Sequence, residues 1–345
     1  MIDFSMAFRK IAEHEHLTEE EMMQLMRQIM NGEASPAQIG ALLMGLAVKG
    51  ETVDEIAGAV RVMRSLAIPV ALPNLPHVVD TCGTGGDGSK TFNISTAAAF
   101  VVAAAGGTVA KHGNRAISSR SGSADVLEAA GVALNLSAEQ VANCIRNVGV
   151  GFLFAPRHHS ATRFAVEPRR ELGIRTLFNL LGPLTNPADA PYQVLGVYAA
   201  RWQVPVAEVL HRLGSRSVLV VHSEDGMDEV SISAPTRIVE LKNGHLSEYA
   251  VQPEDFGLHT SDRSALEVQS VSESLDKLRL SLRADAGPLS EIVALNAGAA
   301  LYVSGITRTW KQGVHLAQDV QSSGQALEKL QDLVAFSRAC GGEQS

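Results

Sequence analysis

The chain has 345 residues, 46% of them hydrophobic and 19% charged, which is enough for one large α/β domain with a smaller companion. Its net charge of −8 argues against a nucleic-acid-binding protein that relies on overall positive charge. The three cysteines form no C-x-x-C pair, and neither a signal-peptide pattern nor a long apolar stretch is present, so we expect a cytoplasmic protein without a disulfide framework, zinc site or membrane segment.

Residues 1–72 show the start and stop signals of several short helices. The signals are Thr18 with Glu21, Gly32, Ser35 with Pro36, Gly50, and Thr52 with Glu55. Helices this short are not stable alone, so they must pack on one another or on a partner. We therefore expect a small helical N-terminal domain, followed by a proline-containing linker.

From residue 77 onward the pattern changes to strands that alternate with helices. The candidate strands are Val78–Asp80, Thr108–Lys111, Val194–Tyr198 and Ser217–His222. The candidate helices are Thr96–Ala105, Ala124–Ala130, Ala138–Asn147 and Val204–Leu213. This alternation predicts an α/β domain over 77–345 with a mostly parallel sheet flanked by helices.

Two later segments predict other elements. Residues 230–250 contain the candidate strands Val230–Ser233, Arg237–Leu241 and Leu246–Val251. The Asn-Gly pair at 243–244 predicts a tight hairpin turn between the last two, so this region is expected to add antiparallel strands. The segment Ala317–Phe336 is expected to form one amphipathic packing helix.

A glycine-rich loop within residues 78–96, V-V-D-T-C-G-T-G-G-D-G-S-K-T-F-N-I-S-T, is the most informative feature of the chain. A strand, a glycine loop and a helix start together form an arrangement that binds phosphate, because glycines let backbone N–H groups approach an anion and the helix start adds positive charge. The loop therefore predicts a phosphorylated ligand.

Two familiar motifs almost fit this loop. Gly83, Gly85 and Gly88 satisfy the G-x-G-x-x-G pattern of dinucleotide-binding proteins, which requires an acidic residue about 20 positions later. The next candidate strand leads instead into the basic residues of Lys111–Arg115. The Walker A pattern fails because Ser89 separates the last glycine from the lysine.

Three further clusters contain residues that could bind a ligand or a metal ion. The basic, hydroxyl-rich segment Lys111–Ser123 suits a polyphosphate, although it could be a solvated loop. The acidic segment Glu224–Glu229 offers oxygen ligands for Mg²⁺, with an exposed acidic turn as the alternative. The arginines of Arg157–Arg175 suit a carboxylate, or form surface salt bridges. The apolar turn Phe178–Pro187 is either a wall for an aromatic substrate or core.

Four motifs resemble those of the anthranilate phosphoribosyltransferase family and occur in the same order as in that family. The resemblance covers nearly the whole chain. The motifs are Asp80–Thr96, Lys111–Ser123, Glu171–Pro187 and Gly226–Glu229. The resemblance implies transfer of 5-phosphoribosyl from phosphoribosyl pyrophosphate (PRPP) to the amine of anthranilate, with release of pyrophosphate. This reaction is the second step of tryptophan biosynthesis from chorismate.

The resemblance also implies how the molecule is organised. The helical domain, residues 1–72, would be joined in space by part of 160–185, and the active site would lie in the cleft between it and the α/β domain, 77–345. The same resemblance implies a homodimer formed through the helical domain, PRPP and anthranilate as ligands, and the use of two Mg²⁺ ions.

Site residues follow from the matched motifs. For PRPP they are Gly83, Gly86, Asp87, Thr91, Asn93, Ile94, Ser95, Thr96, Lys111, His112, Gly113, Asn114, Arg115, Ala116, Ile117, Ser118, Ser119 and Ser123. For anthranilate they are Gly83, Asn114, His159, Arg169 and Pro183. For magnesium they are Ser95, Asp228 and Glu229. No side chain is assigned as a catalytic nucleophile or base.

Two stretches on the anthranilate side depart from the family pattern, namely His159–Thr162, where the family usually has His-Pro-Ala-Met, and Glu167–Arg169, where it usually has Pro-Val-Arg. The alternative functions are a pyrimidine nucleoside phosphorylase, a PRPP-binding homologue that uses another acceptor or is catalytically silent, and a nicotinamide-dependent oxidoreductase. The first has no need of a paired acidic metal site, and the last is disfavoured by the basic residues after the second strand.

Overall fold

The computed structural model describes residues 2–116 and 120–342. Its N-terminal part consists of the helices α1 (Phe4–Ala12), α2 (Glu19–Met30), α3 (Pro36–Lys49) and α4 (Val53–Leu66). Capping boxes begin the last three of these helices, at Thr18, Ser35 and Thr52, because each side chain accepts a backbone N–H three residues later and the third residue bonds back. The predicted helical domain is confirmed.

The carboxylate of Glu55 joins three parts of this helical domain. It is fully buried and caps α4 by accepting the Thr52 N–H at 2.8 Å. It also accepts the Leu17 N–H at 2.9 Å and pairs with the Lys49 ammonium, whose side chain is likewise buried, at 3.0 Å. The end of α3, the start of α4 and the approach to α2 are therefore held by one charged group.

A seven-stranded sheet forms the centre of the larger domain, in the order β3-β2-β1-β4-β5-β6-β7. The strands are β1 (Val78–Gly83), β2 (Thr108–Gly113), β3 (Val150–Phe154), β4 (Tyr192–Gly196), β5 (Ser217–Ser223), β6 (Thr236–Lys242) and β7 (His245–Val251). The first five are parallel and the last two antiparallel. The α/β class and the mostly parallel sheet are thus confirmed, as is the hairpin turn, where Asn243 and Gly244 both have positive φ.

The described residues form eleven further α-helices. They are α5 (Ile94–Ala104), α6 (Ser123–Ala130), α7 (Ala138–Val148), α8 (Ala155–His158), α9 (Arg163–Leu172), α10 (Phe178–Leu184), α11 (Gln203–Arg212), α12 (Val271–Ser281), α13 (Pro288–Val303), α14 (Trp310–Ser323) and α15 (Gln325–Gly342). Short 3₁₀ turns lie at Ser160–Thr162, Ala200–Trp202, Pro253–Phe256 and Arg263–Leu266. In the described part of the chain, no helix is long and apolar enough to cross a membrane.

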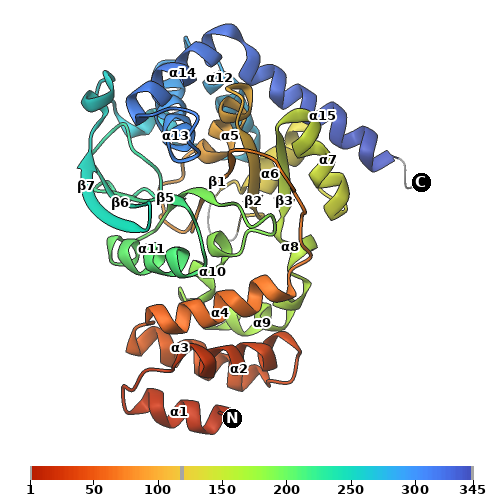
Figure 1. The fold of residues 1–345 in the computed structure, drawn as a ribbon, viewed down its shortest axis with the longest axis vertical. Helices are drawn as coiled ribbons and strands as arrows, with labels where there is room; N and C mark the ends of the chain where they lie inside the picture. The colour runs from red at the N-terminus through yellow and green to blue at the C-terminus, as the bar shows by residue number, and fades with distance from the viewer. Residues whose placement is uncertain (1, 117–119, 343–345) are drawn as a thin grey trace.

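Alternate residues of the strands enter two different cores. Leu219 and Val221 of β5 face the core that contains α5 and α13, whereas Val218 and Val220 face the core that contains α11 and the helical domain. Helix α9 lies beside α2 and α3 (Figure 1) and also contributes to this second core. The chain therefore leaves the sheet after β3, runs along the helical domain and returns before β4.

Three predictions about the elements were wrong or incomplete. The segment Val230–Ser233 is not a strand, because its backbone N–H groups bond to side chains, Val230 to Asn296 and Ser231 to Thr236. The predicted helix Ala317–Phe336 is two helices, since Gly324 between α14 and α15 has a φ of +80°. Strand β3 was not predicted.

We expect Glu55→Ala to lower the free energy of unfolding by about 3–5 kcal/mol, because the buried ammonium of Lys49 would lose its charged partner and two N–H groups would lose their acceptor. Urea denaturation of the full chain checks this. The matched control is Glu20→Ala, which removes an exposed carboxylate from α2 and should cost less than about 1 kcal/mol. Equal losses in the two variants would contradict the role given to Glu55.

Candidate active site

The carboxyl ends of β1, β2 and β4 meet at one edge of the sheet, because these strands are parallel neighbours. The acidic segment that follows β5 crosses this edge. A Cβ atom on Gly83, at the end of β1, would overlap the Asp228 carboxylate, and a Cβ atom on Gly196, at the end of β4, would overlap the Asp228 carbonyl. Glycine at both strand ends therefore lets Asp228 lie directly against the sheet.

The glycine loop is shaped by left-handed backbone and by two carboxylates. Gly85, Gly86 and Gly88 have φ values of +65°, +74° and +77°, which favour glycine. The Gly85 N–H donates to Asp228 Oδ2 at 2.7 Å. The carboxylate of Asp87 accepts the Ser89 N–H at 3.1 Å and lies 3.4 Å from the Asp228 backbone nitrogen, so this acidic residue ties the loop to the acidic segment.

The start of α5 lies next to the second acidic residue. Glu229 Oε1 accepts the Ser95 N–H at 3.1 Å, and the Lys111 ammonium donates to the Thr81 carbonyl and lies 3.4 Å from Ser95 Oγ. The Asn93 side chain, at the N-cap of the helix, is held by the Ser274 hydroxyl at 2.8 Å. The structure thus brings the predicted residues Asn93, Ser95, Lys111 and Glu229 together with the glycine loop.

Three other predicted residues surround this helix start. Thr91 bridges to Glu267 just before the helix, and Ile94 is buried in its first turn. Thr96 is also buried, and its hydroxyl has no hydrogen-bond partner among the described residues. These three therefore border the loop without presenting charge to it.

The pKa values of both acidic side chains are raised by burial. Burial raises the pKa of Asp228 well above its usual value, and the nearby Asp87 and Glu229 raise it further. Burial also raises the pKa of Glu229 to about 7, although Lys111 opposes the shift. A cation between these carboxylates would favour their ionised forms.

The donor atoms at this point fit magnesium that arrives with a ligand. Within residues 2–116 and 120–342, no three His, Cys, Asp or Glu side chains form a metal cage. Mg²⁺ is usually held by one or two carboxylates together with substrate phosphates, so a carboxylate pair beside a phosphate-type loop suffices. The Ser95 hydroxyl adds an oxygen donor close to Glu229.

The basic segment after β2 divides into two groups. Lys111 and His112 are buried in the strand, where the His112 N–H donates to Asp80 at 3.1 Å and Asp80 also accepts from Asn186 at 2.8 Å. Arg115 instead forms two hydrogen bonds with Glu128 of α6, at 2.7 and 2.9 Å. Its guanidinium is therefore neutralised by α6 in this structure.

The remaining predicted residues of this segment line the turn into α6. Gly113 ends β2, and a Cβ atom there would overlap the Ser123 hydroxyl, which bonds to the Asn114 carbonyl at 3.3 Å. The Ala116 N–H donates to Asp125 at 2.9 Å. Ile117, Ser118 and Ser119 lie outside the described residues.

Two buried histidines face each other on the other side of this edge. The rings of His112 and His159 have centroids 5.3 Å apart. Burial lowers the pKa of His159 to about 4 and the pKa of His112 well below its usual value, so both rings are neutral at pH 7. His112 Nδ1 lies 3.0 Å from the carbonyl of Gly182, which precedes Pro183, and neither Nε2 atom has a partner in the described part of the chain.

The structure separates the arginines that the sequence grouped together. Arg170 lies near Glu167 at 3.6 Å, and Arg163 stacks on Phe164. Arg169 stacks on Phe178, with its Cζ 5.0 Å from the ring centre, and burial lowers its pKa. No acidic side chain of the described residues pairs with Arg169. This half-buried cation could therefore bind an anionic ligand.

The apolar turn Phe178–Pro187 is mostly core, since Leu180, Leu181 and Leu184 are buried with the helical domain. Three residues that shape the site were not predicted as site residues. Arg175 donates to the Gly86 carbonyl, Ser274 holds Asn93, and Gly196 makes room for Asp228. The last two follow no local motif, because their partners are distant in the sequence.

Comparisons with known proteins agree with this architecture. The model of the glycosyl transferase family α/β domain matches residues 75–327, and the model of the family's helical bundle domain matches residues 6–67. A protein of Thioalkalivibrio sulfidiphilus named anthranilate phosphoribosyltransferase is 58% identical over 339 residues, which is 98% of this chain and all of that one. The protein of the same name from Marinomonas is 55% identical over 98% of both chains.

Solved structures show the same similarity. Anthranilate phosphoribosyltransferase from Thermus thermophilus has a TM-score of 0.91 and 47% identity, and the match covers 96% of this chain and 99% of that one. The Saccharomyces cerevisiae enzyme in complex with PRPP and Mg has a TM-score of 0.88 and 26% identity, over 97% and 98% of the two chains. The chain therefore belongs to the anthranilate phosphoribosyltransferase family, with the helical-bundle and α/β domains of the glycosyl transferases.

Proposed function

We propose that the chain transfers the 5-phosphoribosyl group of PRPP to the amine of anthranilate, the second step of tryptophan biosynthesis from chorismate. The observation that carries this proposal is the half-buried carboxylate pair, Asp228 and Glu229, in contact with both the glycine loop and the start of α5. This arrangement provides backbone donors for phosphates beside a cation site. Family membership and the PRPP and Mg complex of the yeast enzyme support the same ligands.

The donor site would be built on the end of β1, the glycine loop, the start of α5 and the end of β2. In this proposal Gly83, Gly86 and Asp87 shape the loop, and the helix start with Asn93 and Ser95 receives phosphate. Lys111 is already engaged with Thr81 and Ser95, so we assign it to the charge balance of the site. Ile117–Ser119 stay in the proposal on the sequence motif alone.

Magnesium would be held by Asp228, Glu229 and Ser95, and two ions are proposed. The two carboxylates are bonded to different N–H groups, Asp228 to Gly85 and Glu229 to Ser95, which suits separate cations. When bound, Mg²⁺ would neutralise the charge that develops on the departing pyrophosphate. The protein residues orient the donor and exclude water, and no protein nucleophile is needed for the amine to attack the oxocarbenium-like ribosyl carbon.

The acceptor would lie between Arg169 and the two neutral histidines. Arg169 has no acidic partner in the described chain and could bind the anthranilate carboxylate, while His159, Pro183, Asn114 and Gly83 would border the ring. We propose the cleft between the helical and α/β domains as its location. A pyrimidine nucleoside phosphorylase would bind inorganic phosphate and would have no use for the acidic pair, Asp228 and Glu229.

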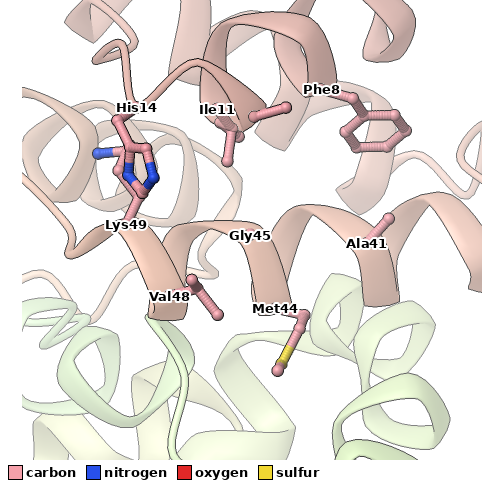
Figure 2. Close-up of a pocket in the computed structure, with 9 residues that line it drawn as sticks. Phe8, Ile11, His14, Ala41, Met44, Gly45, Val48 and Lys49 are labelled. Atoms are coloured by element: carbon pink, nitrogen blue, oxygen red, sulfur yellow. The ribbon is translucent and has the colours of Figure 1, made fainter.

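We also propose a homodimer formed through the helical domain, in a protein that works in the cytoplasm. A cavity of about 450 Å³ lies between α1 and α3. Figure 2 shows Phe8 and Ile11 on one of these helices and Met44 and Val48 on the other. Val48 is 67% exposed and Met44 is 44% exposed. A second copy would cover this apolar surface.

We expect anthranilate fluorescence to decay when enzyme, PRPP and Mg²⁺ are mixed, because the amine becomes ribosylated. Omission of either PRPP or Mg²⁺ should abolish the decay. Stable fluorescence in the complete mixture, with PRPP binding still visible by calorimetry, would contradict anthranilate as the acceptor and leave the donor site standing.

The same assay tests Arg169. Arg169→Ala should raise the KM for anthranilate about tenfold or more, with less than a twofold change in the KM for PRPP, because only the carboxylate partner is lost. Arg170→Ala is the matched control, since Arg170 is exposed on the same helix. Equal effects of Arg169→Ala on both KM values would show that the residue is misassigned.

We expect Glu229→Gln to stabilise the metal-free protein more at pH 8 than at pH 5. The folded-state pKa of Glu229 is about 7 against an ordinary 4.5, so folding favours the protonated form and stability falls as pH rises through this window. The full shift corresponds to roughly 3 kcal/mol. Thermal melts of both proteins in chelator give the difference, and Mg²⁺ with pyrophosphate should reduce it. A difference independent of pH would contradict the assigned environment of Glu229.

We expect Val48→Asp to dissociate the dimer, because a charge would replace an apolar side chain at the centre of the proposed contact. Light scattering coupled to size exclusion measures the mass. Leu280→Asp is the matched control, because Leu280 is 48% exposed on α12 of the other domain. A wild-type protein that is monomeric at micromolar concentration would rule out the dimer.

A further inference from the structure

Arg175 connects the segment between α9 and α10 to the glycine loop. Its guanidinium donates a hydrogen bond to the Gly86 carbonyl. The same guanidinium lies over the ring of Tyr198, with its Cζ 4.5 Å from the ring centre. The arginine is exposed, so neither contact is a consequence of core packing.

The other contacts that hold the start of the loop come from the edge of the sheet. The Thr84 N–H donates to the Gly196 carbonyl at 2.9 Å, and the Thr84 hydroxyl accepts the Tyr198 N–H at 3.0 Å. The Gly85 N–H is held by Asp228 at 2.7 Å. Among the described residues, Arg175 is the contact that reaches the loop from the α9–α10 side.

The chemistry of the contact suits a structural clamp. Two consecutive glycines, Gly85 and Gly86, have positive φ, and such backbone has the greatest freedom to rearrange when unrestrained. A hydrogen bond from a charged donor is stronger than a neutral one. Stacking on Tyr198 fixes the plane of the guanidinium and therefore the direction of its N–H groups.

We propose that Arg175 is a positioning residue that holds the glycine loop in the shape that receives the pyrophosphate of the donor, and that Tyr198 holds Arg175 in place. The identity of the ligand rests on the proposed function. Arg175 acts through the Gly86 carbonyl and is not itself a phosphate ligand in this proposal. Because Arg169 belongs to the same α9–α10 region, one stretch of chain then positions both the donor loop and the acceptor's carboxylate.

The first test needs no substrate. Hydrogen exchange of peptides that cover residues 83–90 should accelerate in Arg175→Ala in the ligand-free full chain, while peptides from β5 and α13 stay unchanged. Arg170→Ala, the exposed neighbour on α9, should leave the loop as in the wild type. Unchanged exchange of the loop in Arg175→Ala would overturn the proposal whether or not the protein has the proposed activity.

The second test is kinetic and separates positioning from direct binding of phosphate. Arg175→Ala should raise the KM for PRPP about tenfold to a hundredfold, the range expected for a misplaced binding loop, with less than a twofold change for anthranilate. Tyr198→Leu should reproduce much of this effect and Tyr198→Phe should not, because phenylalanine keeps the ring.

The double variant Arg175→Ala with Tyr198→Leu should be no worse than Arg175→Ala alone, because both changes remove one clamp. Additive effects, or a Tyr198→Leu variant with wild-type kinetics, would show that Tyr198 does not hold Arg175 in place and would overturn the proposal. Arg175→Lys should restore only part of the affinity, because an ammonium keeps the charge and loses the planar stack.

Discussion

The placement of two half-buried carboxylates at the end of a parallel sheet is the constraint on which the rest of the site depends. Partial burial removes solvent from Asp228 and Glu229, and both have raised pKa values for that reason. The surrounding structure compensates in part through backbone N–H groups from the glycine loop and from α5, and through the ammonium of Lys111. The same donors that stabilise these carboxylates are the ones a phosphate would use. Cation, carboxylate and phosphate are therefore linked, since a change in any one alters the charge balance of the other two.

The two sides of the site use opposite electrostatics. The proposed donor side collects charged side chains and backbone dipoles, which suits a polyphosphate. The proposed acceptor side consists of two neutral imidazoles and apolar groups, with Arg169 as a half-buried cation. Such an environment discriminates little on charge apart from the single anionic group that Arg169 can pair. It also leaves an aryl amine unprotonated, which is the form that attacks carbon.

Local signals predicted most of the fold. The capping boxes at Thr18, Ser35 and Thr52 are complete within four residues, and the Asn-Gly turn is complete within two, so both could be identified without knowledge of the tertiary structure. The segment Val230–Ser233 has a strand-like composition, but its hydrogen-bond partners are side chains such as Asn296, which the sequence does not place nearby. Strand β3 is short and follows α7 after one glycine, so its apolar residues could be taken as the end of that helix.

The candidate site was predicted by its motifs and missed where its contacts are distant. Asn93 and Ser274 are 181 positions apart, and no pattern links them. Arg115 shows the converse, since its motif suggests a ligand while its guanidinium bonds to Glu128 thirteen positions later. Composition and spacing identify which segments carry charged residues. The partner of each charged residue depends on how the helices pack, which the motifs do not specify.

Gly196 has a consequence for how natural variation in this chain should be interpreted. It bears no side chain, belongs to a strand and is not one of the proposed ligand-binding residues, yet any larger residue would push the Asp228 backbone off the sheet edge. Selection for activity would therefore constrain this position as tightly as a metal-binding carboxylate. A survey that ranks positions by their tolerance of substitution would place Gly196 among the functional residues, although it contributes only by having no side chain.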